Sequence, residues 1–140
     1  MLKQLPFLIS GLIIGIILFQ SSLIAPAINK LIPLKDAAVL LRFIWPKFFI
    51  IIGCLSLISF LIFTNYTLTQ PIVKYLALTS FLLMTFCYFI TPMINEAKDI
   101  SNNQLWTILH LTTIIMTLIV FVFIVKSSTL SSLTQSCFHL

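Results

Sequence analysis

Four long stretches of the chain contain no Asp, Glu, Lys or Arg, and this pattern constrains the fold more than any other feature. They cover residues 4–29, 48–73, 75–95 and 100–125. Each reaches the roughly 20 residues that a helix needs to cross a bilayer, where a spanning segment must satisfy its own backbone hydrogen bonds. The 140 residues are 60% hydrophobic and 8% charged, outside the range of soluble domains. The sequence therefore predicts an all-α polytopic membrane protein, an antiparallel bundle of four transmembrane helices.

The expected spans lie at about 7–28, 47–63, 73–93 and 105–125 within these runs. Residues 1–126 then form a transmembrane domain, and the Ser/Thr-rich residues 127–140 form a mobile tail. The first run also resembles a secretory signal, because Ala25 and Ala27 form an A-x-A pattern. It is longer than a signal core of about 7 to 15 residues, so we interpret it as a span.

The basic residues flank the runs and indicate an orientation. On the side of the first and third loops lie Lys30, Lys35, Arg42, Lys47 and Lys98, against Lys3, Lys74 and Lys126 on the other side. By the positive-inside rule the first side is cytoplasmic and both termini lie outside. The expected location is the plasma (inner) membrane if the source is bacterial. Because the net charge of +5 is spread over helix ends, we expect no nucleic-acid partner.

Small residues predict which face of the first helix is packed. Helices in lipid associate through small and polar residues, because lipid tails are as apolar as the helices themselves. The stripe consists of the G-x-x-x-G pair Gly11 and Gly15, continued by Phe19, Ser22 and Pro26. We expect it to pack inside the bundle, with homo-oligomerisation through Gly11 and Gly15 as the alternative. Gln20 lies on the opposite face and is expected to meet lipid headgroups.

The second and third helices carry similar stripes. The faces comprise Ala38, Arg42, Pro46, Phe49, Gly53, Ser56 and Phe60 in the second, and Ala77, Phe81, Met84, Tyr88, Thr91 and Asn95 in the third. Gly53 and Pro46 are expected at helix contacts, and Pro92 lies beside the last turn of the third span. Pro46 either kinks the second helix or begins it. If the helix begins near Ala38, Arg42 points inward; if Pro46 kinks or begins the helix, Arg42 lies on an interfacial segment instead.

Polar residues gather at the helix ends on one side of the membrane. The candidate pocket residues are Ser22, Arg42, Asn95, Glu96 and His110, whereas the opposite half is almost purely apolar. Intramembrane polar groups are costly and usually face the bundle or a water-filled cavity. The sequence therefore predicts a one-sided polar vestibule with His110 as its central group. The alternative is that His110 donates to a backbone carbonyl and only holds the bundle together.

Several motifs follow one another in a familiar order. After G-x-x-x-G come Ala25-Pro26, "FIWPKFF", "ITPMINEAKD" and "LWTILHL". This order resembles the four-span membrane family catalogued as domain of unknown function 4149, relatives of the eukaryotic transmembrane protein 205. The resemblance covers about residues 7–126 and implies no established activity. It implies family positions for Gly15, Ala25, Pro26, Pro46, Pro92, Asn95 and His110. The chain departs from the pattern at Phe48 and Phe49, where tyrosines are expected, and at Leu111 and Thr112, where basic residues commonly occur.

These observations favour a non-enzymatic membrane component that binds a small molecule, ion or lipid headgroup in the vestibule. The sequence contains no recognisable catalytic triad, Walker loop, dinucleotide fingerprint or zinc array. The alternative is a haem- or copper-binding redox protein using His110, since four-helix bundles can hold haem through facing histidines. Only one imidazole is expected inside the membrane, so bis-histidine ligation of haem would need a dimer. Ligation by His110 and a methionine would need Met84, Met93 or Met116 to face it, and copper would need Met84 or Cys87 beside it. We therefore expect no cofactor, and the lipid bilayer is the expected partner.

Overall fold

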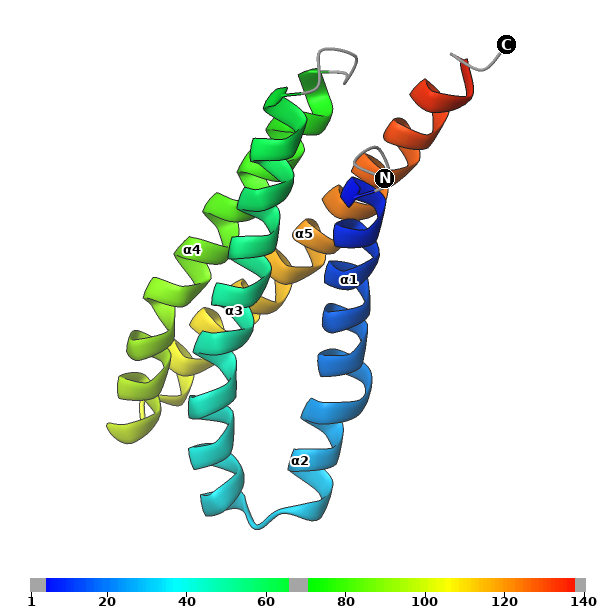
Figure 1. Cartoon of the computed structure of the whole chain (residues 1–140). Coiled ribbons are helices and arrows are strands. Elements are labelled where there is room, and N and C mark those ends of the chain that lie inside the picture. Colours follow the sequence, from blue (N-terminus) through cyan, green and yellow to red (C-terminus); the bar gives the residue numbers. More distant parts are fainter. Residues whose placement is uncertain (1–4, 66–70, 138–140) are drawn as a thin grey trace.

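The computed structural model describes residues 5–65 and 71–137, and this part of the chain is helical throughout except for short connections. Its elements are α1 (Leu5–Phe19), the π-helix η2 (Gln20–Ile24), α2 (Ala25–Leu31), α3 (Leu34–Asn65), α4 (Pro71–Asp99) and α5 (Asn103–Cys137). The helices α1, η2 and α2 follow one another without a break, so they act as one bent rod (Figure 1).

Within the described residues, four segments are long and apolar enough to cross a membrane. They are Phe7–Leu31, Lys35–Asn65, Pro71–Asp99 and Asn103–Ser132. Successive spans run in opposite directions, so the connections α2–α3 and α4–α5 lie at one end, here called the loop end (Figure 1). The start of α1 and the end of α5 lie at the other end. The predicted all-α bundle of four transmembrane helices is confirmed.

The core is built from apolar side chains, mostly branched or aromatic, that face one another across the spans. Its buried members are Ile9, Ile13, Ile17, Phe48, Phe49, Ile52, Met84, Cys87, Val120 and Ile124. Helix α3 packs along α4, α4 along α5, and α1 against both α3 and α5. Many large apolar side chains, such as Leu8 and Leu12, point outward and would contact lipid. In a bilayer this exposure is the expected arrangement, because the surrounding solvent is itself apolar.

The glycine face of α1 does not pack inside the bundle, so this prediction is wrong. Gly11 and Gly15 are exposed, and a Cβ added at either would meet no atom within 4 Å. The rest of the stripe, Phe19, Ser22 and Pro26, is exposed as well. The buried face is the isoleucine row described above. Both rows have helical spacing, so periodicity alone could not decide which one faces α3 and α5. Homo-oligomerisation through Gly11 and Gly15 stays a prediction.

Gln20 is buried rather than directed at headgroups, which is a second correction. It is 7% exposed and continues the face of Ile13 and Ile17. The π-helix begins at this residue, and such single-turn bulges shift the register of the face that follows. The Nε2 atom of Gln20 has no hydrogen-bond partner among the described residues.

Helix α3 is longer than the sequence predicts because Pro46 lies inside it. The helix begins at Leu34, and Pro46 neither begins nor ends it. Arg42 is therefore a helical residue one turn before the proline. Gly53 lies at a close helix contact, as expected: a Cβ there would lie 3.6 Å from the Met84 Cβ. Helix α4 likewise continues past Pro92 to Asp99, and Pro92 itself is exposed.

Helix α5 does not end near Val125 but continues through the Ser/Thr-rich segment to Cys137, where a tail was expected. Two hydroxyl groups in this segment donate to carbonyls of the preceding turn. The Thr129 Oγ1 lies 2.9 Å from the Lys126 carbonyl, and the Ser132 Oγ lies 2.8 Å from the Thr129 carbonyl. This back-bonding satisfies the hydroxyl groups within the helix and lets a polar run remain helical.

Candidate functional site

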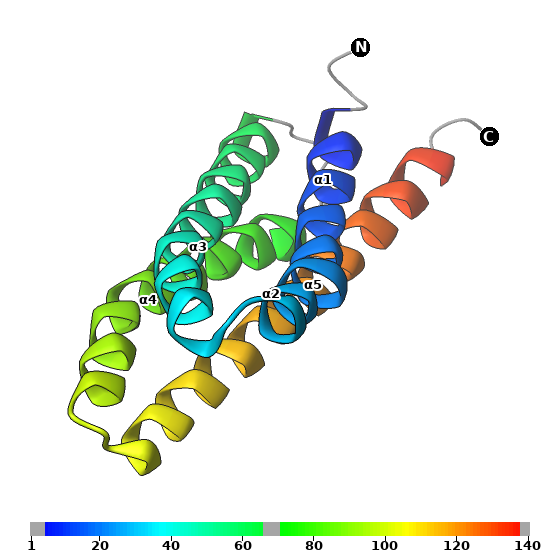
Figure 2. The same cartoon turned by 90° about the horizontal axis from the view of Figure 1, so that it is seen from below.

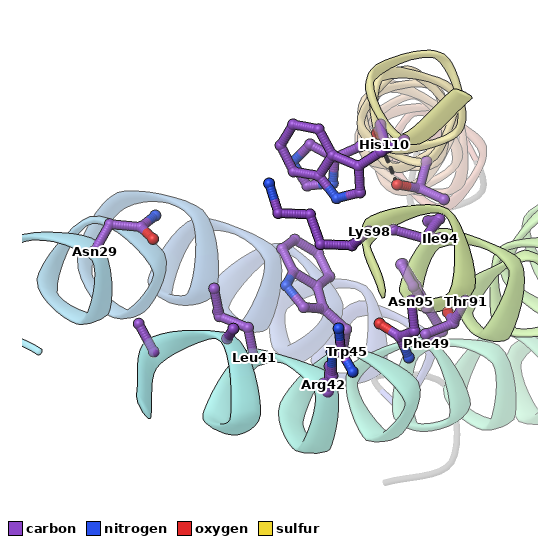
Figure 3. A pocket seen from close by; sticks show the side chains of 14 residues that line it. Asn29, Leu41, Arg42, Trp45, Phe49, Thr91, Ile94, Asn95, Lys98 and His110 are labelled. Atoms are coloured by element: carbon purple, nitrogen blue, oxygen red, sulfur yellow. Dashed lines mark hydrogen bonds between the residues drawn. The ribbon is translucent and has the colours of Figure 1, made fainter. Parts of the chain in front are cut away.

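A pocket of about 240 Å³ opens at the loop end of the bundle, between α2, α3, α4 and α5. Its polar lining residues are Asn29, Arg42, Thr91, Asn95, Lys98, His110 and Thr113. Its aromatic lining residues are Trp45, Phe49 and Trp106, and small or aliphatic side chains complete the wall. Figure 3 shows Asn29 across the pocket from His110 and Asn95. The pocket therefore combines apolar walls with polar groups from four different helices.

Aromatic rings hold His110 in the wall. Its imidazole stacks on Trp106, with ring centroids 5.3 Å apart and planes 9° from parallel. These two residues are four apart on α5 and so share one helix face. Trp45 of α3 meets the imidazole edge-on, at 6.2 Å and 88°. The ring nitrogens of His110 make no hydrogen bond to any described residue, so they stay free to bind a ligand.

Two cations from different helices line the same pocket. Arg42 of α3 forms a bidentate ion pair with Asp99 at the end of α4, in which Nη1 lies 3.1 Å from Oδ2. The Lys98 ammonium lies over the indole of Trp106, 4.5 Å from the ring centroid. Within residues 5–65 and 71–137, Lys98 has no carboxylate partner, and no Asp or Glu lines the pocket. The site is therefore positively charged.

The threonine hydroxyls are used locally. Thr91 donates to the Cys87 carbonyl at 2.9 Å, and Thr113 donates to the His110 carbonyl at 2.8 Å. Each oxygen still has lone pairs that can accept a hydrogen bond. Neither hydroxyl donates to a base, so the pocket as described contains no activated nucleophile.

The structure brings together three of the five predicted pocket residues. Arg42, Asn95 and His110 line the pocket, whereas Glu96 and Ser22 do not. Glu96 follows Asn95 directly, so it lies about 100° further around α4, and it is exposed. Ser22 is exposed because the packed face of this rod is the one that carries the isoleucines and Gln20.

Four further residues line the pocket that the sequence pattern does not predict there: Asn29, Trp45, Lys98 and Trp106. A signal was present for three of them, because helical spacing puts Lys98 on the Asn95 face, Trp45 on the Arg42 face and Trp106 on the His110 face. We interpreted Lys98 only as a charge that sets orientation, although one residue can serve both purposes. Asn29 had no comparable signal, since its position depends on the bend at η2.

None of the methionines or cysteines expected as a second metal ligand lines the pocket with His110. The ring neighbours of His110 are the indoles of Trp45 and Trp106, and the side chains of Arg42 and Lys98 line the same pocket. Cations close to a site disfavour a bound metal cation. Met84 and Cys87 are fully buried in the core and do not line the pocket. The described residues contain no group of three His, Cys, Asp or Glu side chains that could hold a metal.

Four antiparallel apolar spans define this chain as a polytopic helical membrane protein, and its pocket lies at one end of the bundle. Residues 8–103 match the family described as a domain of unknown function (DUF4149), and the chain belongs to that family. The match contains Arg42, Asn95 and Lys98 but ends before Trp106 and His110. No curated protein and no solved structure matches the chain, so the expected relation to transmembrane protein 205 is not confirmed.

Proposed function

We propose that this protein is a non-enzymatic membrane component that binds an anionic group, a phosphate or a carboxylate, in the pocket at its loop end. The observation that carries the proposal is the Lys98 ammonium, held over Trp106 in a pocket wall without a carboxylate. Lys98 is exposed, so its ammonium is accessible to a ligand, and it has no ion-pair partner among the described residues. A bound anion would supply a counter-charge.

The hydrogen-bonding groups of the pocket favour an anion as well. Lys98, Arg42 and a protonated ring nitrogen of His110 are donors, and the side-chain amides of Asn29 and Asn95 add further N–H groups. Hydrogen bonds from charged donors to phosphate or carboxylate oxygens are shorter and stronger than neutral ones. The stacking of His110 on Trp106 reduces the freedom of the ring before a ligand arrives.

Thermal unfolding of the detergent-purified protein tests the proposal, with inorganic phosphate as the probe and sodium chloride at matched ionic strength as the reference. A ligand that binds only the folded state at about 100 times its Kd adds ~2.7 kcal/mol of stability. We expect phosphate to raise the Tm of the wild type, and Lys98→Gln to remove most of that increase.

Lys47→Gln is the matched control, because Lys47 is an exposed lysine of the same end that does not line the pocket. It should keep the full response to phosphate. An equal response of the two variants would mean that phosphate acts on general surface charge, and the proposed site would be abandoned.

A further inference from the structure

Helix α2 stands apart from the rest of the bundle. It contacts η2 and α3, but no Cα atom of α2 lies within 8 Å of a Cα atom of α4 or α5. Packed helices have axes about 8–10 Å apart, so α2 is not packed against either of them. The α1 part of the same rod does contact α5. The π-helix η2 has no such contact with α5 either, so the rod separates from α5 from the end of α1 onward, toward the loop end.

The course of α5 explains this separation. Seen from the loop end, α5 begins beside the end of α4 and crosses toward α1 (Figure 2). Its first turns, which carry Trp106 and His110, are therefore on the α4 side of the pocket. The opposite side has only Asn29 from α2, and Asn29 is exposed. Between α2 and α5 the pocket has no packed helix wall, so it is open sideways, between two helices that both belong to candidate membrane spans.

The size of the pocket limits what it can enclose. Cavities that bury a whole drug-sized ligand measure about 300–1,000 Å³. At about 240 Å³, this pocket has room for a polar headgroup but not for the acyl chains of a lipid as well. The lining is suited to a headgroup with attached chains, because Leu41, Phe49 and Ile94 place apolar surface beside the cations.

The charge balance indicates how much negative charge fits. Arg42 is paired with Asp99, whereas Lys98 is unpaired among the described residues. Arg42, Asp99 and Lys98 together therefore carry one net positive charge. Resting on the proposed anion site, we infer that the pocket binds the headgroup of a membrane lipid with a single negative charge, which reaches it laterally through the gap between α2 and α5. The acyl chains stay in the leaflet on the loop-end side.

The test uses the full chain in nanodiscs that contain phosphatidylglycerol and phosphatidylcholine with the same acyl chains. Native mass spectrometry then measures which lipid stays bound to the released protein. Glycerophosphoglycerol, the same headgroup without chains, serves as the soluble competitor. The variants are Lys98→Gln, which removes the free cation, and Asn29→Trp, which fills the α2 side of the gap. Asn65→Trp is the control, because Asn65 is an exposed asparagine at the opposite end of α3.

We expect phosphatidylglycerol to be retained about tenfold over phosphatidylcholine, a preference equivalent to ~1.4 kcal/mol. Both Lys98→Gln and Asn29→Trp should abolish the preference, Asn65→Trp should keep it, and the chain-free headgroup should fail to displace the lipid. If glycerophosphoglycerol binds as tightly as the lipid and Asn29→Trp has no effect, lateral lipid binding is wrong while the anion site stands. If neither molecule binds in a way that depends on Lys98, the proposed function fails together with this inference.

Discussion

His110 is the residue on which the binding and the structural interpretations differ most. Its ring is stacked on Trp106 and touched by Trp45, and it makes no hydrogen bond to a described residue. The predicted bond to a backbone carbonyl is therefore not found in this part of the chain. The ring could still stabilise the bundle through stacking, which contributes about 0.5–1.5 kcal/mol per aromatic pair beyond area burial. The two roles can be separated, because phenylalanine keeps the stacking and loses the ring nitrogens.

His110→Phe should fold with an unchanged Tm and bind phosphate more weakly. Loss of a hydrogen bond to a charged group costs about 1.5 kcal/mol or more, equivalent to roughly tenfold in Kd. The measurement is the phosphate-dependent shift in Tm, with His110→Ala as the comparison that also removes stacking. A His110→Phe protein that binds phosphate as the wild type does would assign His110 a packing role only.

The glycines of α1 and α3 should respond differently to a larger side chain. Gly53→Leu should destabilise the bundle by about 1–3 kcal/mol, because the added atoms must fit beside Met84. Gly15→Leu should be tolerated, since nothing lies within 4 Å of a Cβ at that position. Unfolding of both variants in detergent gives the comparison, and equal destabilisation would contradict the exposed position of Gly15. Chemical cross-linking of the same proteins tests the oligomer. If Gly15→Leu loses the cross-linked oligomer while the wild type and Gly53→Leu keep it, homo-oligomerisation through the Gly11 and Gly15 face is supported.

At the scale of elements, the start of α5 determines where Trp106 and His110 lie. The turn between α4 and α5 places Ser101 at a positive φ of 57°. The next residue, Asn102, caps α5, because its Oδ1 accepts a hydrogen bond from the Leu105 backbone N–H at 3.1 Å. An asparagine at this position satisfies one of the free N–H groups of the first turn. The sequence around this turn therefore orients the aromatic wall of the pocket.

Asn102→Ala should cost about 1 kcal/mol of stability, because the first turn of α5 loses its cap. Asn102→Asp keeps an acceptor oxygen and should remain close to the wild type. Thermal unfolding compares the three proteins, and the phosphate response shows whether fraying of the first turn weakens the pocket. Identical stability of the alanine and aspartate variants would show that the cap does not anchor α5.

For the whole molecule, the orientation across the membrane remains a prediction from charge. Lys30, Lys35, Arg42, Lys47 and Lys98 all lie toward the loop end, which the positive-inside rule places in the cytoplasm. The pocket would then open at the cytoplasmic leaflet. Anionic lipids of that leaflet give it a negative surface potential, which attracts basic residues close to the membrane.

Single cysteines at exposed positions test this orientation, in a background where Cys54, Cys87 and Cys137 are replaced by alanine. A membrane-impermeant maleimide applied to intact cells should label Thr64→Cys, near the end of α3, and leave Ser101→Cys unlabelled until the cells are opened. The reverse labelling pattern would place the pocket on the outer side and overturn the charge-based prediction.

The sequence alone was sufficient to predict three features: the number of spans, the all-helical class and the end of the molecule at which polar groups gather. Each of these depends on local composition: uncharged runs of bilayer length and polar residues at their ends. Arg42, Asn95 and His110 were found in this way. The length of α3 was missed because Pro46 suggested a boundary, although the helix passes through it.

Only the tertiary structure decided which face of each helix is buried and which residues meet in the pocket. On α1, the row that contains Gly11 and Gly15 and the row that contains Ile13 and Ile17 both have helical spacing. The isoleucine row is the one that packs against α3 and α5. Asn29 reaches the pocket through the bend at η2, and Lys98 meets Trp106 through the turn between α4 and α5. Helix periodicity describes one helix at a time, whereas a pocket depends on how several helices cross, and that is determined by packing between residues far apart in the chain.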